Sequence, residues 1–545
     1  MKVPFSWLKE FVPISVDVQT LCDKLVSIGF EVEDCVYLGS EIENVVVGKI
    51  EKIEPHPNAD KLIVCKINVG NEVLQIVTGA HNVREGDLVP VAKHHSKLPG
   101  GVEITKGKLR GVESNGMLCS GKELGITEDV YQGAEVNGIL ILSEKEPVGE
   151  DIRKVLGLDD YVLDVAITSN RPDCNSVWGV AREVAVALGE ECAAPDVLFT
   201  EDAVHSVQDM VKVDVVAPDL CPNYYARGVY DVQIAPSPLW MRRKLWKMGL
   251  RGISNMVDIT NYVLMEMGQP MHAFDHDHIL NDHIIVRRAV DGEKIVPLDQ
   301  NEYVLNHDTL VIADEERAVG LAGIMGGSNS GISESTRAVI FEAAKFKREN
   351  IRHSSRKLGI HSDSSARFEK GVDSYTAELA LHRACHLVQQ LHCGKIATGQ
   401  ICVCDKEHYS KTVSFGFDRI QKLLGIEIPK EQVLSILKTL KIDTKIKNNV
   451  VTCVIPPYRE DIERDCDIIE ELIRVYGYDK IQSTLLESSR ITNGGKHPFA
   501  LQVDYIKEIL NGLGYSETIT YSFGSESVCD KLILPKQDAR RAQIK

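Results

Sequence analysis

Between residues 40 and 150 the sequence is divided into short apolar segments separated by glycine, among them VVVGKIEKI, LIVCKINVG and EVLQIVTGA. Short segments at regular spacing, bounded by turn residues, are typical of strands. A run of such strands favours a small closed β-barrel. This barrel constrains the rest of the chain, because the residues on either side of it must fold elsewhere.

The segments that flank the barrel are each too short to fold alone. Residues 1–39 predict a helix that begins after Asp17 and ends at Gly29, followed by a strand. Residues 151–190 predict a strand and then an apolar-faced helix. We therefore expect these two segments to form one small α/β domain into which the barrel of residues 40–150 is inserted.

Composition limits the class of protein. A chain of 545 residues is long enough for roughly three or four domains. Its net charge of −17 excludes a generally basic surface, so a polyanion must bind to a local patch. There is no apolar run of the ~18 residues that span a bilayer and no secretory signal at the start. We expect no membrane association.

The 14 cysteines are scattered and contain no CxxC pair, which favours reduced thiols in a cytoplasmic protein. The densest group lies between residues 385 and 404 and matches no zinc module. Buried thiols are therefore expected there.

An acidic linker at residues 190–210 leads into the largest candidate domain, residues 211–395, which should be mixed α/β. It contains the stretch RGISNMVDITNYVLMEMGQPMHAFD. The break at Gly268–Pro270 places His272 on a loop after a turn. His272 is then either a buried, hydrogen-bonded histidine or a residue that meets a ligand. Glu342 follows three apolar residues of an expected strand, where a carboxylate is either paired or functional.

Residues 345–367 of the same domain hold seven Lys/Arg against two acids. They form either a solvated helix face or a patch that attracts a polyanion.

Residues 408–480 read as a small α/β unit with helices at 417–424 and 431–440 and a strand at 450–455. On a further helix, Asp467, Glu470 and Glu471 share one face. These acids either favour the start of the helix or, with Asp461, bind a hard cation. Residues 481–545 predict a helix at 501–510 and a strand at 517–523.

Two sets of motifs resemble known families. HPNADKL at 56–62, taken with GVESNGMLCS at 111–120, resembles the OB-fold tRNA-binding domain of several synthetases. The order TNYVLMEMGQPMHAFD, GIMGG, FEAAKF and GIHSDSSARFEKGVD resembles the editing domain of the bacterial phenylalanyl-tRNA synthetase β subunit. The resemblance covers nearly the whole chain, and it implies that residues 481–545 begin an antiparallel class II-like core that stops short.

The resemblance implies a set of site residues. For hydrolysis of a wrongly charged tRNA these are Thr260, Asn261, His272, Glu342, Ser362 and Ser364, with substrate contacts from Arg251, Gly326 and Gly327. For a magnesium site shared with an α subunit they are Asp461, Asp467, Glu470 and Glu471. Where the family usually carries Thr and then Ala, this chain has Ser362 and Ser364.

The resemblance also implies partners: an α subunit that carries the ATP chemistry, in an (αβ)2 assembly, and tRNA(Phe), but no DNA. The chain would support charging of tRNA(Phe) and hydrolyse tyrosyl-tRNA(Phe). The alternative is a stand-alone fragment that binds tRNA or removes the amino acid from mischarged tRNA.

Overall fold

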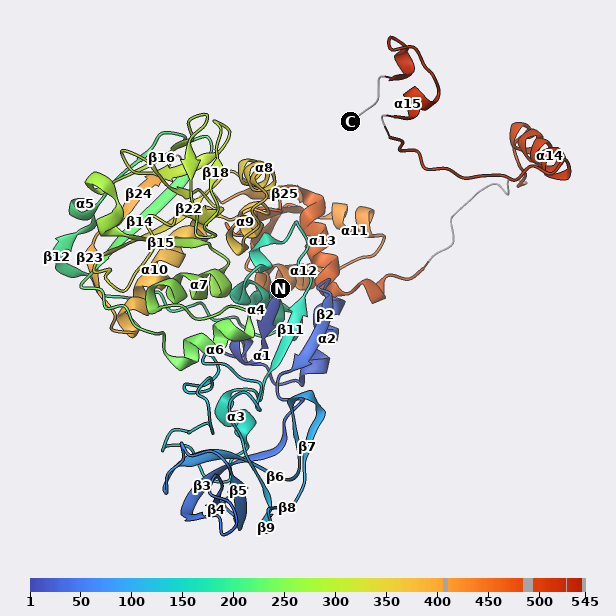
Figure 1. Ribbon diagram of the computed structural model, residues 1–545. Helices are drawn as coiled ribbons and strands as arrows, with labels where there is room; N and C mark the ends of the chain where they lie inside the picture. The colour runs from blue at the N-terminus through green and yellow to red at the C-terminus, as the bar shows by residue number, and fades with distance from the viewer. Residues whose placement is uncertain (405–409, 484–493, 526, 542–545) are drawn as a thin grey trace. The chain divides into compact units, whose positions relative to one another are not determined.

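The computed structural model describes residues 1–404, 410–483, 494–525 and 527–541 (Figure 1). The chain divides into two compact units, Met1–Ile481 and Gln482–Lys545. In the described part of the chain, every helix is too short or too polar to cross a bilayer.

A three-stranded antiparallel sheet joins the two flanks of the barrel segment. Its order is β1 (Lys2–Pro4), β11 (Tyr161–Val165), β2 (Val32–Tyr37). Helices α1 (Phe5–Leu8), α2 (Val18–Ser27) and α4 (Val177–Leu188) supply buried apolar side chains to the same core. The predicted first helix is confirmed: the Asp17 carboxylate accepts the Thr20 amide at 3.0 Å, and Gly29 follows the helix with a φ of +94°.

The glycine-punctuated region forms a six-stranded sheet. Its path is β10 (Gly116–Leu118), β6 (Leu88–Leu98), β3 (Glu43–Pro55), β4 (Ile63–Asn68), β5 (Val73–Thr78), with β7 (Val102–Ile104) also paired to β6. The two ends of this path approach each other, since the Asn115 amide donates to Gln75 O at 2.8 Å. Close packing requires glycine in β3, because a Cβ on Gly48 would lie 2.5 Å from Val91 Cγ2.

The central sheet carries the residues singled out in the sequence. Its order is β12 (Asp202–Ser206), β23 (Lys395–Thr398), β14 (Asn223–Tyr230), β22 (Val339–Lys345), β15 (Met271–Asp275), and β24 (Ile401–Cys404) also pairs with β14. Helices α7 (Asn255–Met267) and α10 (Ser374–Gln390) lie along the sheet (Figure 1) and pack with Phe341 and Ala343 in one apolar cluster. Ile340 and Ala344, which alternate with them, belong to a second cluster on the other face.

A five-stranded sheet contributes to that second cluster. Its order is β13 (Lys212–Val215), β16 (His283–Arg288), β19 (Leu310–Ala313), β20 (Ala318–Leu321), β21 (Met325–Gly326). Helices α8 (Arg348–Leu358) and α9 (Asp363–Phe368) follow β22 and add Ile351 and Phe368 to the same cluster.

The loop predicted for His272 is wrong. Helix α7 ends at Gly268, whose φ is +81°, and the chain enters strand β15 only three residues later. The turn is therefore shorter than the sequence suggested. His272 lies within a hydrogen-bonded ladder.

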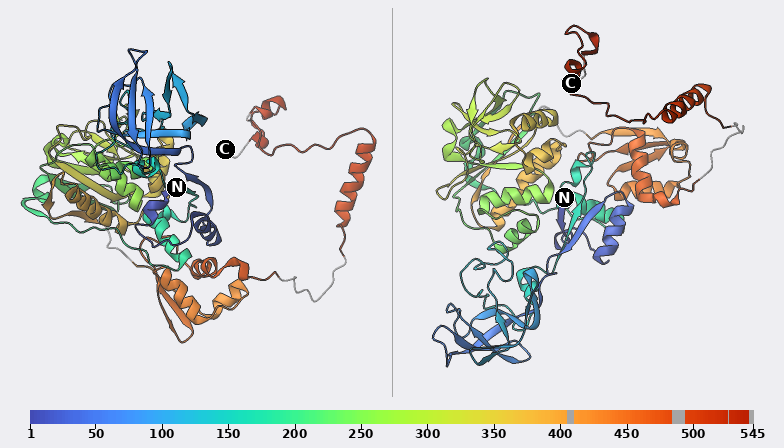
Figure 2. Two further views of the ribbon diagram at one scale, coloured as in Figure 1. Left: turned by 90° about the horizontal axis from the view of Figure 1, so that it is seen from below. Right: turned by 45° about the vertical axis from the view of Figure 1, so that its right-hand side comes forward.

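Within the first unit, residues 410–481 form a small subdomain around β25 (Thr412–Gly416), β27 (Val450–Val454) and β26 (Asp443–Lys447). The predicted strand is confirmed as β27, and the three predicted helices are confirmed as α11 (Asp418–Leu424), α12 (Lys430–Thr439) and α13 (Asp465–Tyr476). The end of α2 lies beside α13 (Figure 2), and Arg474 Nη1 donates to Ile28 O at 3.4 Å.

In the second unit the predicted helix is confirmed as part of α14 (Pro498–Gly512), which precedes the short helix α15 (Val528–Lys531). The strand predicted at 517–523 is wrong, because these residues have no regular structure. Ile519, Tyr521 and Phe523 are 99%, 98% and 97% exposed. An alternating apolar pattern forms a strand only when a neighbouring strand or apolar surface covers it.

Candidate functional site

The candidate site begins with the register of two antiparallel strands. In the ladder between β15 and β22, His272 lies directly opposite Glu342, and on the other side of β22 Glu342 lies opposite Ala226 of β14. Opposed residues of an antiparallel pair project from the same face, with Cβ atoms about 5 Å apart. Two residues that are far apart in the sequence are thereby placed side by side.

Both side chains line a cavity of about 90 Å³ between the two sheets. Its wall comprises Pro270, Met271, His272, Phe274, Ile312, Gly320, Leu321, Gly323, Ile324, Met325, Gly326, Glu342, Phe346, Ser364 and Phe368. An apolar cavity of about 150 Å³ is known to hold benzene. A ligand with a phenyl ring therefore requires a wall side chain to move, and the unbranched Met325 is suited to this.

Glu342 is 6% exposed and accepts a hydrogen bond from the Tyr224 hydroxyl at 2.9 Å, through Oε2. In the described part of the chain it forms no ion pair with a Lys, Arg or His. Burial, only partly offset by the Tyr224 hydrogen bond, raises the pKa of the Glu342 carboxyl to about 7. Near neutrality the group is therefore present both as the acid and as the carboxylate.

His272 presents a neutral imidazole. Burial lowers its pKa to about 4. Its Nε2 atom is buried and has no hydrogen-bond partner among the described residues. The ring meets Phe274 edge-on, with centroids 4.4 Å apart, and a Cβ on Gly326 would lie 2.2 Å from His272 Cε1. The imidazole is thus held by packing, while Nε2 remains available to a ligand.

Two serines tie α9 to the turn between β20 and β21. Ser364 Oγ donates to Gly323 O at 3.1 Å, and Ser362 Oγ donates to Ile324 O at 2.6 Å. Ser362 also caps α9 by accepting the Ser365 amide at 3.0 Å. Only Ser364 reaches the cavity wall.

The structure does not bring the other predicted residues into this wall. Thr260 and Asn261 lie on α7, and the Thr260 hydroxyl donates to Val257 O at 2.7 Å within that helix. Arg251 is exposed ahead of α7. Gly327 is packed against Val319, whose carbonyl oxygen would lie 2.5 Å from an added Cβ.

Sequence reasoning missed Tyr224. It is fully buried on β14, two strands away from His272, and its hydroxyl donates to the Glu342 carboxyl. In the sequence it is one of two adjacent tyrosines on an apolar strand, and no local pattern shows which of the two faces the acid. That choice depends on the pairing of β14 with β22.

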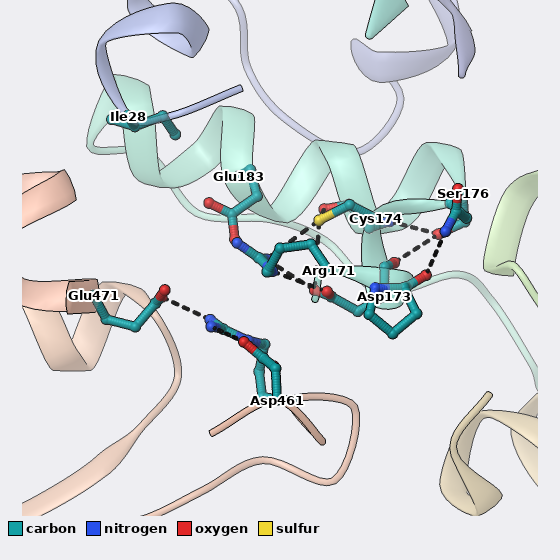
Figure 3. Close-up of polar contacts among 12 residues, drawn as sticks. Ile28, Arg171, Asp173, Cys174, Ser176, Glu183, Asp461 and Glu471 are labelled. Carbon is teal, nitrogen blue, oxygen red and sulfur yellow. Dashed lines mark hydrogen bonds and ion pairs between the residues drawn. The ribbon is translucent and has the colours of Figure 1, made fainter. Parts of the chain in front are cut away.

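The carboxylates predicted to bind magnesium lie in and beside a buried network of ion pairs (Figure 3). Arg459 donates to both Asp461 oxygens at 2.9 and 2.8 Å and to Glu471 at 2.6 Å. Arg474 donates to Glu471 at 2.8 and 2.6 Å and to Glu183 of α4 at 2.8 Å. Burial by itself would raise the pKa of Glu471, but the two arginines hold it far below its usual range.

The network continues into the N-terminal α/β core. Arg171 bonds to Asp173 at 3.0 and 2.9 Å, to Cys174 Sγ at 3.2 Å, and to Glu183. Burial by itself would raise the pKa of Asp173. The charge and hydrogen bond of Arg171, together with the charges of Arg459 and Arg182, outweigh burial and lower this pKa to about 2. Asp173, Cys174 and Glu183 are close enough to hold a metal ion, but the guanidinium of Arg171 already contacts all three.

The other two predicted magnesium ligands are more accessible. Asp467 accepts the amides of Glu463 and Arg464 at 2.9 and 2.8 Å and so closes the start of α13. Glu470 is exposed on the same helix. Four carboxylates suit a hard cation in chemical type. The contacts of Asp461 and Glu471, however, are already taken by arginine, so the four do not form a ready-made ion cage within this chain.

Comparison with known families covers most of the chain. Residues 45–151 match a family of tRNA binding domains, 220–393 the B3/4 domain, 413–478 the tRNA synthetase B5 domain, and 481–545 the phenylalanyl tRNA synthetase beta chain CLM domain.

Several similar proteins are phenylalanine–tRNA ligase beta subunits. The phenylalanine–tRNA ligase beta subunits of Clostridium acetobutylicum and Clostridium tetani are 44% and 43% identical to this chain over all of its length and 68% of theirs. That of Staphylococcus aureus is 39% identical over 96% of this chain and 66% of its own. An N-terminal fragment of the Pyrococcus horikoshii phenylalanyl-tRNA synthetase beta subunit is 16% identical with a TM-score of 0.38, too distant to indicate more.

Because the pKa of Glu342 is raised in the folded chain, we predict that this group makes the free energy of unfolding decrease as the pH rises. Its pKa is about 7 in the folded chain against 4.5 for the free group. Between these values the folded state binds more protons than the unfolded state, so stability falls with rising pH, by roughly 3 kcal/mol in total. Glu342→Gln should remove this dependence. The test compares the free energies of unfolding of parent and variant in urea at about pH 5 and about pH 8. The same difference between the two proteins at both pH values would refute the prediction.

The packing of Gly326 against His272 predicts that Gly326→Ala destabilises the chain. The added methyl group must displace the imidazole, at a cost of roughly 1–3 kcal/mol. Gly331→Ala is the matched control, since its nearest atom, Leu298 Cδ2, would lie 3.7 Å away at an ordinary contact distance. Urea unfolding of both variants measures the difference. Equal stabilities would show that the ring is not confined.

The ion network predicts that Glu471→Ala destabilises the junction of α13 and α4. The change leaves Arg459 and Arg474 buried without this partner, which costs about 3–5 kcal/mol. Glu470→Ala, on the exposed side of α13, should change the free energy of unfolding by less than about 0.5 kcal/mol. Differential scanning calorimetry without magnesium tests both, and an unaltered Glu471→Ala transition contradicts the structural role.

Proposed function

Because the chain belongs to the family of phenylalanine–tRNA ligase beta subunits, we propose that its central cavity hydrolyses tyrosyl-tRNA(Phe) while charging occurs on an α subunit. The observation that carries this proposal is the pairing of Glu342 with His272 at one cavity. Glu342 and the Nε2 atom of His272 are buried, and both groups can form hydrogen bonds to a ligand.

A charging pocket shaped for a phenyl ring discriminates weakly against the same ring with a hydroxyl group. An apolar pocket rejects such an added hydroxyl by only about 10²-fold. A second site that binds the hydroxyl directly overcomes this limit, because a ligand without it leaves buried polar groups unpaired. Tyrosine is then retained and hydrolysed, whereas phenylalanine is released.

Glu342 and His272 suit that discrimination. Tyr224 occupies Oε2 of Glu342, so the acid is held in place while its other oxygen can meet a phenol. The unpartnered Nε2 of His272 lies at the same cavity and provides a second polar contact. The glycine at position 326 allows the backbone of β21 to approach the ligand as closely as it approaches the imidazole.

Water is the proposed nucleophile. The hydroxyls of Ser362 and Ser364 donate to backbone carbonyls of the 323–324 turn, and neither donates to a basic side chain among the described residues. We therefore assign the hydrolysis to a water molecule oriented at the ester, assisted by the terminal hydroxyl of the tRNA. Thr260, Asn261, Arg251 and Gly327 lie outside the cavity wall, so we assign them no step of the hydrolysis.

A basic helix next to the cavity supports the approach of tRNA. On α8, the side chains of Arg348, Arg352, His353, Arg356 and Lys357 are exposed. The helix leads directly into α9, which carries Ser364 of the cavity wall. On a chain with a net charge of −17, such a local patch is where phosphates can bind. The family of tRNA binding domains matched at 45–151 offers a second contact with the same RNA.

The remaining partners follow from the family. We propose an (αβ)2 assembly in the cytoplasm, with ATP bound by α. Asp461, Asp467, Glu470 and Glu471 are the carboxylates that magnesium would use at the junction with α, where it would have to compete with Arg459. A stand-alone deacylase is the less favoured alternative, because the similarity to the beta subunits runs over the whole of this chain.

The test is deacylation of tyrosyl-tRNA(Phe) by Glu342→Gln in the full chain, alone and with the α subunit. We expect the rate to fall by at least about 10²-fold, as when one positioned hydrogen-bonding group is lost from an active site, with charging of phenylalanine unchanged. Phenylalanyl-tRNA(Phe) should be spared by parent and variant.

Glu316→Gln is the matched control, because it removes an exposed acid from the segment between β19 and β20, outside both the cavity and the basic helix α8. It should deacylate like the parent. Glu342→Asp, which keeps the acid but shortens it, separates loss of the group from loss of folding. Undiminished hydrolysis by Glu342→Gln would refute the proposed function.

A further inference from the structure

Two cysteines differ from all the others in exposure. Of the 14 cysteines, only Cys402 and Cys404 are exposed, while the other twelve are buried or partly buried. The buried thiols expected at this end of the sequence are therefore limited to Cys385 and Cys393. Cys402 and Cys404 lie two residues apart on β24, and alternate residues of a strand project from the same face.

The two sulfur atoms are in contact. Cys402 Sγ and Cys404 Sγ lie 2.8 Å apart, whereas Ile401 and Val403 turn to the apolar cluster on the other face of the sheet. In the ladder, Cys402 lies opposite Tyr225 of β14, so the thiols share the sheet face that α10 covers. Glu342 and Tyr224 belong to the opposite face, which separates this pair from the cavity.

We propose that Cys402 and Cys404 are a modification site that forms a reversible disulfide when the chain meets a small disulfide oxidant such as glutathione disulfide. One thiol loses its proton, attacks the oxidant and forms a mixed disulfide, releasing one glutathione thiolate. The second thiol then loses its proton and attacks the protein sulfur of that mixed disulfide, releasing the other glutathione. The two cysteines together give up two electrons and two protons, and the glutathione disulfide is reduced to two thiols.

The strand geometry makes this bond labile. Two residues of an extended strand separate the Cα atoms by roughly 6.6 Å, near the upper limit for a disulfide. Bonds that are strained or exposed have more oxidising potentials and are easily reduced again. The pair thus suits a reversible oxidation better than a permanent crosslink. Burial raises the pKa of the Cys402 thiol to about 12, so the oxidation is best followed in a mildly alkaline buffer.

The experiment uses the full reduced chain, equilibrated in glutathione buffers of increasing potential and then alkylated. We expect the doubly alkylated peptide that contains residues 402 and 404 to give way to an unalkylated peptide that is two hydrogen atoms lighter than the reduced, unmodified peptide. The ratio of the doubly alkylated peptide to the disulfide peptide should fall about tenfold for each ~30 mV increase in potential, as a two-electron couple requires. Dithiothreitol should restore both alkylations.

Two single variants and a matched control make the result specific. Cys402→Ser and Cys404→Ser should each leave one thiol that carries a single glutathione and forms no internal bond. Cys192→Ser, which removes a partly buried thiol elsewhere, should leave the oxidation unchanged. The proposal is overturned if both thiols remain alkylatable at every potential, if each binds its own glutathione, or if the bond links two chains.

Discussion

The site depends on a backbone ladder. Strands β14, β22 and β15 are hydrogen-bonded in one register, and this register places Tyr224, Glu342 and His272 at a common face. Hydrogen bonds between strands fix that register, and a slip by one residue would turn each side chain to the face covered by α7 and α10. The acid and the imidazole need no direct contact with each other, because the sheet holds both. Both groups therefore line one cavity of about 90 Å³.

Local features of the fold were predictable where a residue acts on its own neighbours. Asp17 precedes α2 and caps it, and the helix predicted at 417–424 ends at Gly425, whose φ is +75°. Glu342 could be singled out because a carboxylate among apolar strand residues needs a reason to be there. The strand position of His272 could not be foreseen, since the short turn at Gly268 and the pairing with β22 are decided by residues about 70 positions later.

Long-range charge pairing explains what sequence spacing misses. The acids of α13 share a helix face with the spacing of a binding site, yet Glu471 meets Arg459 and Arg474, and through Arg474 it reaches Glu183 of a segment almost 300 residues earlier. Arg474 lies on the same helix, three residues after Glu471, but spacing along that helix does not reveal Arg459 from the preceding loop or Glu183 from α4. The strand predicted at 517–523 failed for a related reason, because an apolar alternation becomes a strand only where a partner covers it.

The hydrogen bond from the Ser364 hydroxyl to Gly323 O limits the contacts that this side chain can make with a ligand in the cavity. Because the Ser364 hydroxyl already donates its hydrogen bond to Gly323 O, it can offer a ligand only its Cβ atom and the remaining lone pairs of Oγ. Compared with alanine at this position, Ser364 makes the cavity smaller without adding a hydrogen-bond donor that faces a ligand. Replacing Ser364 with alanine would enlarge the cavity and would also remove the hydrogen bond that holds the turn at Gly323. The volume of the cavity and the rigidity of this turn therefore change together.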